Sequence, residues 1–471
     1  MSPFDAWRLS ATDLAAAIRR KDISCHEATV SVLARIADVN PRINALPSVT
    51  AARALAAAEA ADAAVARGDH LGPLHGVPVS IKVNIDVAGE ATDGGIVALK
   101  DLIAADDAPV VANLKRAGAV IVGRNNAPAF SLRWFTDNDL HGRTLNPFDA
   151  GVTPGGSSGG AAAAVATGMG AIAHGNDYGG SIRHPAWACG VVGLRTTAGR
   201  VPAFNGTAKD ERIVSNQLMS VQGPLTRTVA DARLALAVMA QGDARDPLWV
   251  PAPLTQADTG RPLKVALFKH HAAYDADPSV VVALTQAAQW LAAAGCDVEE
   301  AEPPHFEEGA ELWRQMVYDD LRRSGVPAIE AMGDAAVKQN LRDSMAGMAS
   351  LDRDGYLGAL QRRLAISRAW SLFLQRHPVL LMPVCWQRQF AIDEDTHDAA
   401  RMQRLIRAQS PLLGTAMMGL PGLSVPTGMA GSLPTGVQLV GWRFREDLLL
   451  RAAEIIEQAA GFSALQHLAP R

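Results

Sequence analysis

The apolar positions of this chain follow two different periods, and each period predicts a type of element. Apolar residues that recur about every three to four positions predict helices, and the clearest run covers residues 49–67, directly before Gly68, a residue that often ends helices. Short continuous apolar runs predict strands, and one of these covers residues 77–83. Further helices are expected to begin at Ser10 and to cover residues 108–117, 159–169, 229–240 and 448–460. Further strands are expected at residues 119–123, 171–174, 263–268, 379–382, 423–425 and 437–440.

Strands that alternate with helices of about ten residues are typical of a layered α/β fold. No repeat and no low-complexity linker divides the chain. We therefore predict one large α/β/α layered domain over residues 1–471, built around a mixed, mostly parallel sheet. Residues 303–350 are helical in pattern and mixed in charge. They are either a helical insertion that covers a site or an ordinary pair of surface helices.

Composition narrows the class of protein. The 471 residues are 48% hydrophobic and 20% charged, with a net charge of −4, which is the balance of a soluble globular protein. Without a basic block or an acidic tail, neither nucleic acid nor an anionic membrane surface is an expected partner. The four cysteines are scattered, which disfavours a disulfide framework and a zinc site. The first residues lack the pattern of a secretory signal, and we expect a cytoplasmic protein.

Two glycine-rich segments each carry a serine, Ser157 and Ser181. A serine is a weak nucleophile and needs a base. His174 and His184 flank Ser181, but no pattern links either histidine to a carboxylate. Lys82 ends an apolar run, and a lysine that is buried without a counter-ion can be neutral and act as a base. The alternative is a lysine at the end of a strand with its ammonium group in water.

The two serine segments allow several interpretations. Residues 155–159 match the G-x-S-x-G nucleophile elbow, but residues 146–154 before them predict a loop and not the strand that this motif needs. The P-loop pattern for phosphate is absent. The glycines before Ser181 allow successive backbone N–H groups to converge on one point and stabilise an oxyanion. An ordinary tight turn is the alternative for both segments.

Taken together, these segments resemble the amidase signature family of serine hydrolases. The resemblance is densest from Gly72 to about Asp231 and weaker near the C-terminus. The matching segments are Gly76–Lys82, Gly123–Asn126, Asn146–Asp149, Thr153–Gly160, Gly179–Ala186, Gly190–Arg195, Gly223–Leu225, Val229–Asp231, Gly419–Pro426 and Gln438–Gly441.

The resemblance implies a role for each matching residue. Ser181 corresponds to the acylated nucleophile and Lys82 to the base. Ser157 corresponds to a bridging serine that follows Gly156 through a cis peptide bond. The backbone amides that correspond to the oxyanion hole are those of Tyr178, Gly179, Gly180 and Ser181. The family implies an amidase signature fold and a mechanism that needs neither a metal nor an organic cofactor.

The chain also departs from the family's usual residues at four places. Val83 stands where an acid usually follows the lysine, and Ala129 stands where a glutamate usually precedes phenylalanine. Arg195-Thr196-Thr197 replaces Lys-Pro-Thr, and Ala416 replaces an asparagine. None of these changes removes Lys82 or either serine. They do prevent the substrate of any one subfamily from being carried over to this chain.

The substrate pocket is predicted less sharply than the catalytic residues. Trp134 is a candidate for substrate binding, and His184 either faces a polar acyl group or is a structural histidine. Other apolar side chains either line the pocket or pack in the core. These are Phe135, Trp313, Met316, Tyr318, Trp370, Met417 and Met418.

The expected function is a stand-alone hydrolase of a small linear amide, as a monomer or a homodimer. The same machinery would act on an aryl ester or a carbamate, and the sequence does not choose among them. One alternative is the A-type subunit of an amidotransferase that releases ammonia from glutamine for a partner complex. The other is a binding protein without activity, which the presence of Lys82, Ser157 and Ser181 together disfavours.

Overall fold

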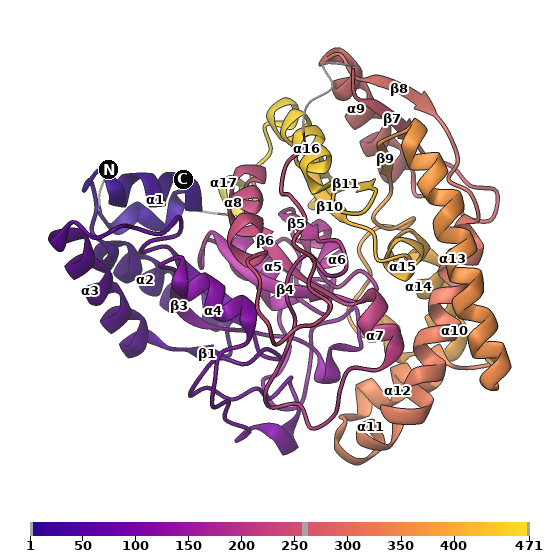
Figure 1. Ribbon diagram of the computed structural model, residues 1–471, viewed down its shortest axis with the longest axis horizontal. Coiled ribbons are helices and arrows are strands. Elements are labelled where there is room, and N and C mark those ends of the chain that lie inside the picture. The colour runs from indigo at the N-terminus through magenta and orange to yellow at the C-terminus, as the bar shows by residue number, and fades with distance from the viewer. Residues whose placement is uncertain (1–2, 257–261, 469–471) are drawn as a thin grey trace.

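The computed structural model describes residues 3–256 and 262–468, and one 11-stranded sheet runs through it (Figure 1). The strands lie in the order β1-β3-β2-β4-β6-β5-β10-β11-β9-β7-β8. Their bounds are β1 (Ser48–Val49), β2 (Pro78–Lys82), β3 (Val120–Asn125), β4 (Ile172–Asp177), β5 (Val192–Arg195), β6 (Val221–Thr226), β7 (Lys264–Leu267), β8 (Asp297–Glu300), β9 (Val379–Met382), β10 (Gly422–Ala430) and β11 (Leu433–Gly441).

The predicted α/β class and mixed sheet are confirmed, but the expectation of a mostly parallel sheet is wrong. Within the described residues six strand pairs are antiparallel and four are parallel. One of the antiparallel pairs is that of β10 and β11, which form a hairpin across Gly431 and Ser432. Gly431 has a φ of 65°, which suits a two-residue hairpin turn. A pattern of strands between helices does not reveal such direct pairing.

Helices cover both faces of the sheet. The α-helices are α1 (Ala11–Arg19), α2 (Cys25–Ile43), α3 (Ala51–Arg67), α4 (Pro109–Arg116), α5 (Gly159–Ala166), α6 (Arg183–Ala188), α7 (Val214–Met219), α8 (Val229–Met239), α9 (Pro278–Ala293), α10 (Phe306–Ser324), α11 (Val326–Met332), α12 (Ala335–Ser344), α13 (Arg353–Arg376), α14 (Ala399–Ala408), α15 (Ser410–Met417), α16 (Glu446–Ala460) and α17 (Ala464–Leu468). None of the helices among the described residues is both long enough and apolar enough to cross a membrane.

Local sequence signals set several of these boundaries. The hydroxyl of Ser10 accepts a hydrogen bond from the Asp13 backbone and caps α1, as its position in the sequence predicts. Ser24 and Glu27 form a reciprocal capping box at the start of α2. Gly68 ends α3 with a φ of 76°, a left-handed conformation that costs glycine little.

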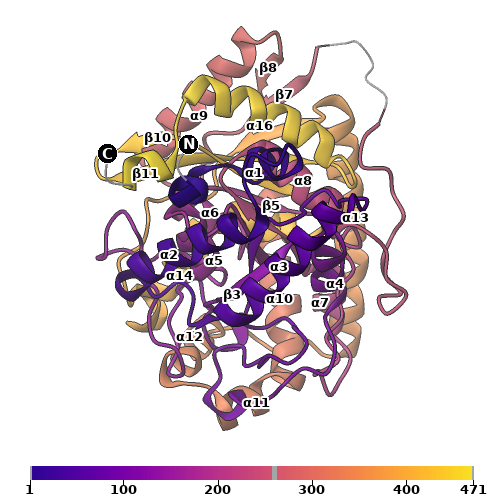
Figure 2. The same cartoon turned by 90° about the vertical axis from the view of Figure 1, so that its left-hand side faces the viewer.

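The two faces of the sheet pack against different sets of helices. On one face, α8, α9 and α16 bury their apolar residues against β5, β7 and β9 to β11. On the other face, α2, α5 and α6 cover one half of the sheet, whereas α10, α13, α14 and α15 cover the other half. Figures 1 and 2 show α1 to α4 at one end of the molecule.

The topology brings the candidate catalytic segments to one edge of the sheet. In β2, Val79 and Ile81 join the core on one face, so Ser80 and Lys82 face the opposite side. β2 pairs in parallel with β4, and therefore both strands end at the same edge. Lys82 is the last residue of β2, and Asp177, the last of β4, leads directly into the loop that carries Ser181.

The segment 303–350 forms α10, α11 and α12, and α13 follows it along the outer edge of the molecule (Figure 1). α10 packs extensively against α15. Through Trp313, α10 also reaches the loop between β4 and α6, because the indole ring lies directly over Gly179. The segment is helical, as its sequence pattern predicts, and it lies against the loop that carries Ser181.

Candidate active site

Lys82 is fully buried and ends among three oxygen atoms. Its Nζ lies 2.7 Å from Ser157 Oγ, 3.0 Å from Ser158 Oγ and 2.7 Å from Asn176 Oδ1. All three partners are neutral. The structure therefore brings Lys82 and Ser157 into direct contact and gives the amine no carboxylate partner at hydrogen-bond distance among the described residues.

This environment favours the neutral amine. Burial lowers the pKa of Lys82 well below its ordinary value of 10.5, and the negative charge of Asp177 opposes that shift only in part. A buried ammonium group without a counter-ion loses more hydration than hydrogen bonds to neutral oxygens return. The surroundings of Lys82 therefore favour the uncharged amine, which is the form that can accept a proton.

The two serine segments meet beside Lys82. The peptide bond between Gly156 and Ser157 is cis, as the family resemblance implies. The Ser158 backbone N–H donates to the carbonyl of Ser181 over 3.2 Å, which ties the first serine loop to the second. Ser181 itself is 7% exposed and lies among the residues that line a cavity.

Asp177 organises the loop that carries Ser181. Its carboxylate accepts hydrogen bonds from the backbone N–H groups of Gly180 over 2.8 Å and Ile182 over 3.2 Å. It also forms ion pairs with Arg183 and Arg195, at 3.0 Å each, and all three side chains are fully buried. Burial would raise the pKa of Asp177, but the two guanidinium groups hold it well below its ordinary value. This carboxylate is therefore a fixed negative charge.

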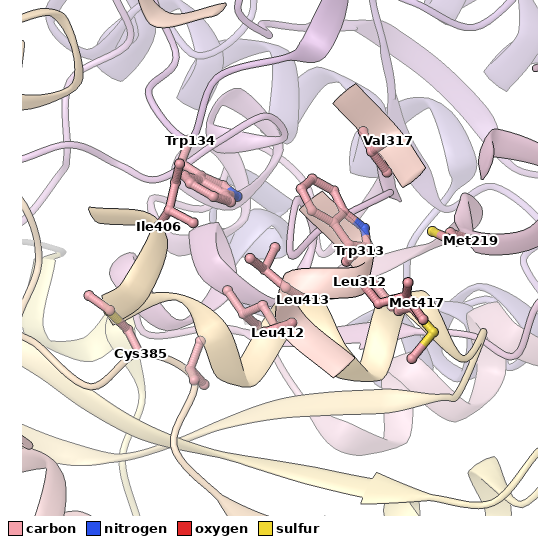
Figure 3. Packing of buried hydrophobic residues seen from close by; sticks show 14 of the residues in the cluster. Trp134, Met219, Leu312, Trp313, Val317, Cys385, Ile406, Leu412, Leu413 and Met417 are labelled. Carbon is pink, nitrogen blue, oxygen red and sulfur yellow. The ribbon is translucent and has the colours of Figure 1, made fainter. Parts of the chain in front are cut away.

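Two tryptophan side chains hold the other side of the same loop. The indole N–H of Trp134 donates to the carbonyl of Gly179 over 3.0 Å, and that of Trp313 donates to the carbonyl of Tyr178 over 2.9 Å. Figure 3 shows both indoles on the same side of the packed cluster, above Leu412 and Leu413. Fixing a carbonyl also fixes its peptide plane, and with it the direction of the next residue's N–H.

The amides expected to form the oxyanion hole differ in their surroundings. The Gly180 N–H already donates to Asp177. The Gly179 N–H shares a peptide plane with the Tyr178 carbonyl, which accepts from Trp313. The Gly180 N–H shares a peptide plane with the Gly179 carbonyl, which accepts from Trp134. The Tyr178 hydroxyl lies 2.6 Å from Ser215 Oγ, outside the loop.

The cavity beside Ser181 is small and mostly apolar. Its volume is about 40 Å³, and it is lined by Trp134, Tyr178, Trp313 and Tyr318 together with aliphatic side chains from α10 and α12. A water molecule needs roughly 10–15 Å³ of such space, so the cavity has room for a few waters. Arg133 is the one charged residue among the described residues that line it, and this guanidinium is paired with Asp395 in a buried, two-point contact.

The other residues that the sequence suggests for the pocket lie elsewhere. His184 is fully buried, packs against Trp187 and Phe390, and is not among the described residues that line the cavity. Its two ring nitrogens have no partner among the described residues, and burial lowers its pKa to about 3. Most of the further apolar candidates belong to the core and do not line the cavity: Phe135, Met316, Trp370, Met417 and Met418.

Sequence reasoning misses several residues of this site. Asp177, Arg183 and Asn176 lie inside or beside the matching motif, but the motif alone gives them no role. In the sequence, Arg195 stands out only because it replaces the family's usual lysine. In the structure, its guanidinium group donates hydrogen bonds to Asp177 and to the main-chain carbonyls of Met219 and Leu420. An acid and an arginine close together in one glycine-rich motif were the available signal.

Comparisons with known proteins give the family. The family model described as Amidase matches residues 27–450. An indoleacetamide hydrolase of Bradyrhizobium diazoefficiens is 45% identical over 463 residues, which cover 97% of this chain and 88% of the relative. The A-type subunit of the glutamyl-tRNA(Gln) amidotransferase of Moorella thermoacetica is 34% identical, over 97% of this chain and 98% of the relative.

Solved structures agree with this assignment. A bacterial aryl acylamidase of the amidase signature family superposes with a TM-score of 0.84 at 26% identity, over 98% of this chain and 99% of that chain. The chain therefore belongs to the amidase family.

Proposed function

We propose that this chain is a stand-alone amide hydrolase that forms an acyl-enzyme on Ser181, with Lys82 as the base. One observation carries the proposal: Lys82 is buried among neutral partners, and its Nζ lies 2.7 Å from Ser157 Oγ. A lysine in this setting can accept a proton near neutral pH, which an exposed lysine cannot.

The proposed acylation step uses Ser181, Ser157 and Lys82. Ser181 Oγ attacks the amide carbonyl carbon as its proton passes to Ser157 Oγ, while the Ser157 proton passes to Lys82 Nζ. The carbonyl π electrons move onto oxygen and give a tetrahedral oxyanion. Lys82 then returns the proton through Ser157 to the leaving nitrogen, the C–N bond breaks, and the amine departs. The acyl group remains on Ser181 as an ester.

Deacylation repeats the relay with water. Lys82 takes a proton from the attacking water through Ser157, and the C–O bond to Ser181 breaks as that proton returns to the serine. The backbone amides of Tyr178, Gly179 and Ser181 are the proposed donors to the oxyanion. Because the Gly180 N–H binds Asp177, its contribution is to hold the loop in place.

The proposed substrate class is a small primary amide with an aromatic or apolar acyl group, such as an arylacetamide. The aromatic lining of the cavity supports this class. Indole-3-acetamide is the first candidate, since a relative with 45% identity over 97% of this chain is an indoleacetamide hydrolase. The cavity of about 40 Å³ is smaller than such a ligand, so side chains of α10 and α12 must move when it binds.

The amidotransferase alternative receives less support from the cavity. Glutamine carries an ammonium and a carboxylate group, and each needs a charged or strongly polar partner when it is buried. Among the described residues that line the cavity, the one charged side chain is Arg133, and Asp395 already pairs with it. Aryl esters and carbamates, in contrast, remain chemically compatible with the same nucleophile.

The test uses the purified chain alone. We expect it to release ammonia from indole-3-acetamide and the Ser181→Ala variant to release none. Glutamine, a phenyl ester and a phenyl carbamate of similar size are assayed in parallel to rank the substrate classes. Glutamine hydrolysis without arylacetamide hydrolysis would overturn the proposed substrate class. Full activity of Ser181→Ala would overturn the proposed nucleophile.

A further inference from the structure

A chain of side-chain amides runs from Lys82 to the cavity. Asn176 Oδ1 accepts a hydrogen bond from Lys82 Nζ over 2.7 Å. The Nδ2 group of Asn176 donates to Asn84 Oδ1 over 3.1 Å, and the Nδ2 group of Asn84 donates to Ser131 Oγ over 3.0 Å. Ser131 lines the cavity beside Ser181. The acyl-transfer steps described above make no use of either asparagine.

The direction of these hydrogen bonds decides where Lys82 can accept a proton. A neutral lysine has two N–H donors and one lone pair, and an amide oxygen can only accept. Asn176 Oδ1 therefore takes one N–H of Lys82. Ser158 Oγ takes the second, because its own hydroxyl donates to the Asn176 carbonyl over 3.4 Å. The lone pair is then left for the hydroxyl of Ser157.

We propose that Asn176, held by Asn84, is a positioning residue that directs the lone pair of Lys82 toward Ser157. This inference rests on the proposed role of Lys82 as the base. Asn84 matters because it occupies the Nδ2 group of Asn176 and so keeps the amide oxygen, and not the amide nitrogen, on Lys82. Ser131 in turn fixes Asn84 by accepting from its Nδ2 group.

The charge of the side chain at position 176 matters as much as the direction of its hydrogen bonds. The charged and titratable groups nearest Lys82 are Asp177 and His174 on β4 and Arg124 on β3. Asp177 is compensated by Arg183 and Arg195, and His174 is held neutral by burial. A neutral amide at position 176 therefore accepts from Lys82 while favouring its ammonium form much less than a carboxylate there would.

The experiment follows Ser181 directly. The rate of its labelling by a fluorophosphonate is measured against pH for the wild-type chain and for Asn176→Asp, with kcat/KM for indole-3-acetamide alongside. A negative charge within hydrogen-bond distance raises the pKa of a base by about one to three units. We expect the acid limb of both profiles to move to higher pH by that amount in Asn176→Asp, so that the rate at neutral pH falls, by about 1000-fold at most. The rate is expected to recover at high pH.

Two further variants keep the test decisive. Asn84→Asp retains the acceptor for Asn176 and places a charge one residue farther from Lys82, so a smaller shift in the same direction is expected. Asn113→Asp is the matched control, because Asn113 is a buried amide that bonds main-chain carbonyls between α4 and α8. Its acid limb is expected to stay in place even if its thermal stability falls.

The outcomes distinguish a failure of the proposed role of Asn176 from a failure of the proposed function. An Asn176→Asp chain that is folded by circular dichroism and has an unshifted acid limb would overturn the role of Asn176. If that variant does not fold, an unshifted limb in Asn84→Asp overturns it. A wild-type chain in which the fluorophosphonate does not label Ser181 at any pH would instead overturn the proposed function.

Discussion

Lys82 and Asp177 end neighbouring strands at the same edge of the sheet, and both are fully buried. Their surroundings nevertheless favour the charged form of one and the uncharged form of the other. Asp177 has two guanidinium partners at 3.0 Å and remains an anion. Lys82 has three neutral oxygen partners and is driven toward the uncharged amine. Burial alone therefore does not decide the charge of a group, since the charges of its partners do.

The two residues therefore have different proposed roles in the site. The anion at Asp177 accepts hydrogen bonds from backbone N–H groups of the loop that carries Ser181. In the proposed mechanism, the amine of Lys82 gains and loses a proton during the reaction. Because the two residues end neighbouring parallel strands, the proposed proton acceptor lies beside the start of the loop that carries Ser181.

The largest expected effect comes from removing the fixed charge. Asp177→Asn keeps the shape of the side chain but leaves two buried guanidinium groups without a counter-ion. We expect a loss of about 3–5 kcal/mol in the free energy of unfolding, measured with urea, and loss of most activity. Because the pKa of Asp177 is depressed, its stabilisation is present above the ordinary value of 3.8 and is lost as the pH falls below it.

An exposed ion pair provides the control for Asp177. Asp22 pairs with Arg20 on the surface, where both side chains are more than half exposed. Asp22→Asn should therefore change the free energy of unfolding by less than about 1 kcal/mol. A similarly small change for Asp177→Asn would contradict the claim that the buried ion pairs of Asp177 stabilise the fold.

The next effect comes from removing the adjustable group. Lys82→Met is expected to lower kcat by about 10²- to 10⁴-fold, the usual contribution of a general base. The free energy of unfolding should stay within about 1 kcal/mol of the wild-type value, because the variant also removes the cost of burying an amine. That cost is present below the ordinary lysine pKa of 10.5, where the unfolded chain binds a proton that the folded chain does not. Near-normal turnover at neutral pH would refute the assignment of the base.

A smaller effect is expected where a tryptophan holds the nucleophile loop. Trp313→Phe keeps a ring over Gly179 but removes the N–H that binds the Tyr178 carbonyl. We expect kcat to fall roughly fivefold, the equivalent of one hydrogen bond of about 1 kcal/mol, with little change in KM. Trp370→Phe is the matched control, because Trp370 is equally buried and its N–H binds the Pro304 carbonyl away from the cavity. An equal fall in kcat for both variants would show that the effect is only structural.

The smallest effect is expected at His184. Its ring nitrogens have no partner among the described residues, and the pKa of about 3 keeps the imidazole neutral above weakly acidic pH. His184→Leu is expected to leave kcat/KM unchanged and to leave thermal stability unchanged or slightly higher, since an unbonded polar group is removed. A clear loss of kcat/KM, with the fold intact, would instead place His184 in substrate recognition.

The serine loops and the strand-end lysine could be located from the sequence because their signals are local. Glycines mark the loops, and the apolar run before Lys82 predicts its strand. The ion pairs of Asp177 depend on Arg195, which belongs to another strand, so their arrangement follows from the topology of the sheet. The sequence pattern does not predict β8, because it is an exposed edge strand of mostly acidic residues without apolar alternation.

The central claim is that Lys82 is neutral in the folded protein, and a lysine titration tests it most directly. The chain is labelled with ¹³C at the lysine ε-carbons, and the Lys82 signal is assigned by its absence in Lys82→Met. We predict that this signal titrates well below the ordinary lysine value of 10.5. A Lys82 signal that titrates near the ordinary value of 10.5 would contradict the account, because the amine would then be an ammonium group at neutral pH.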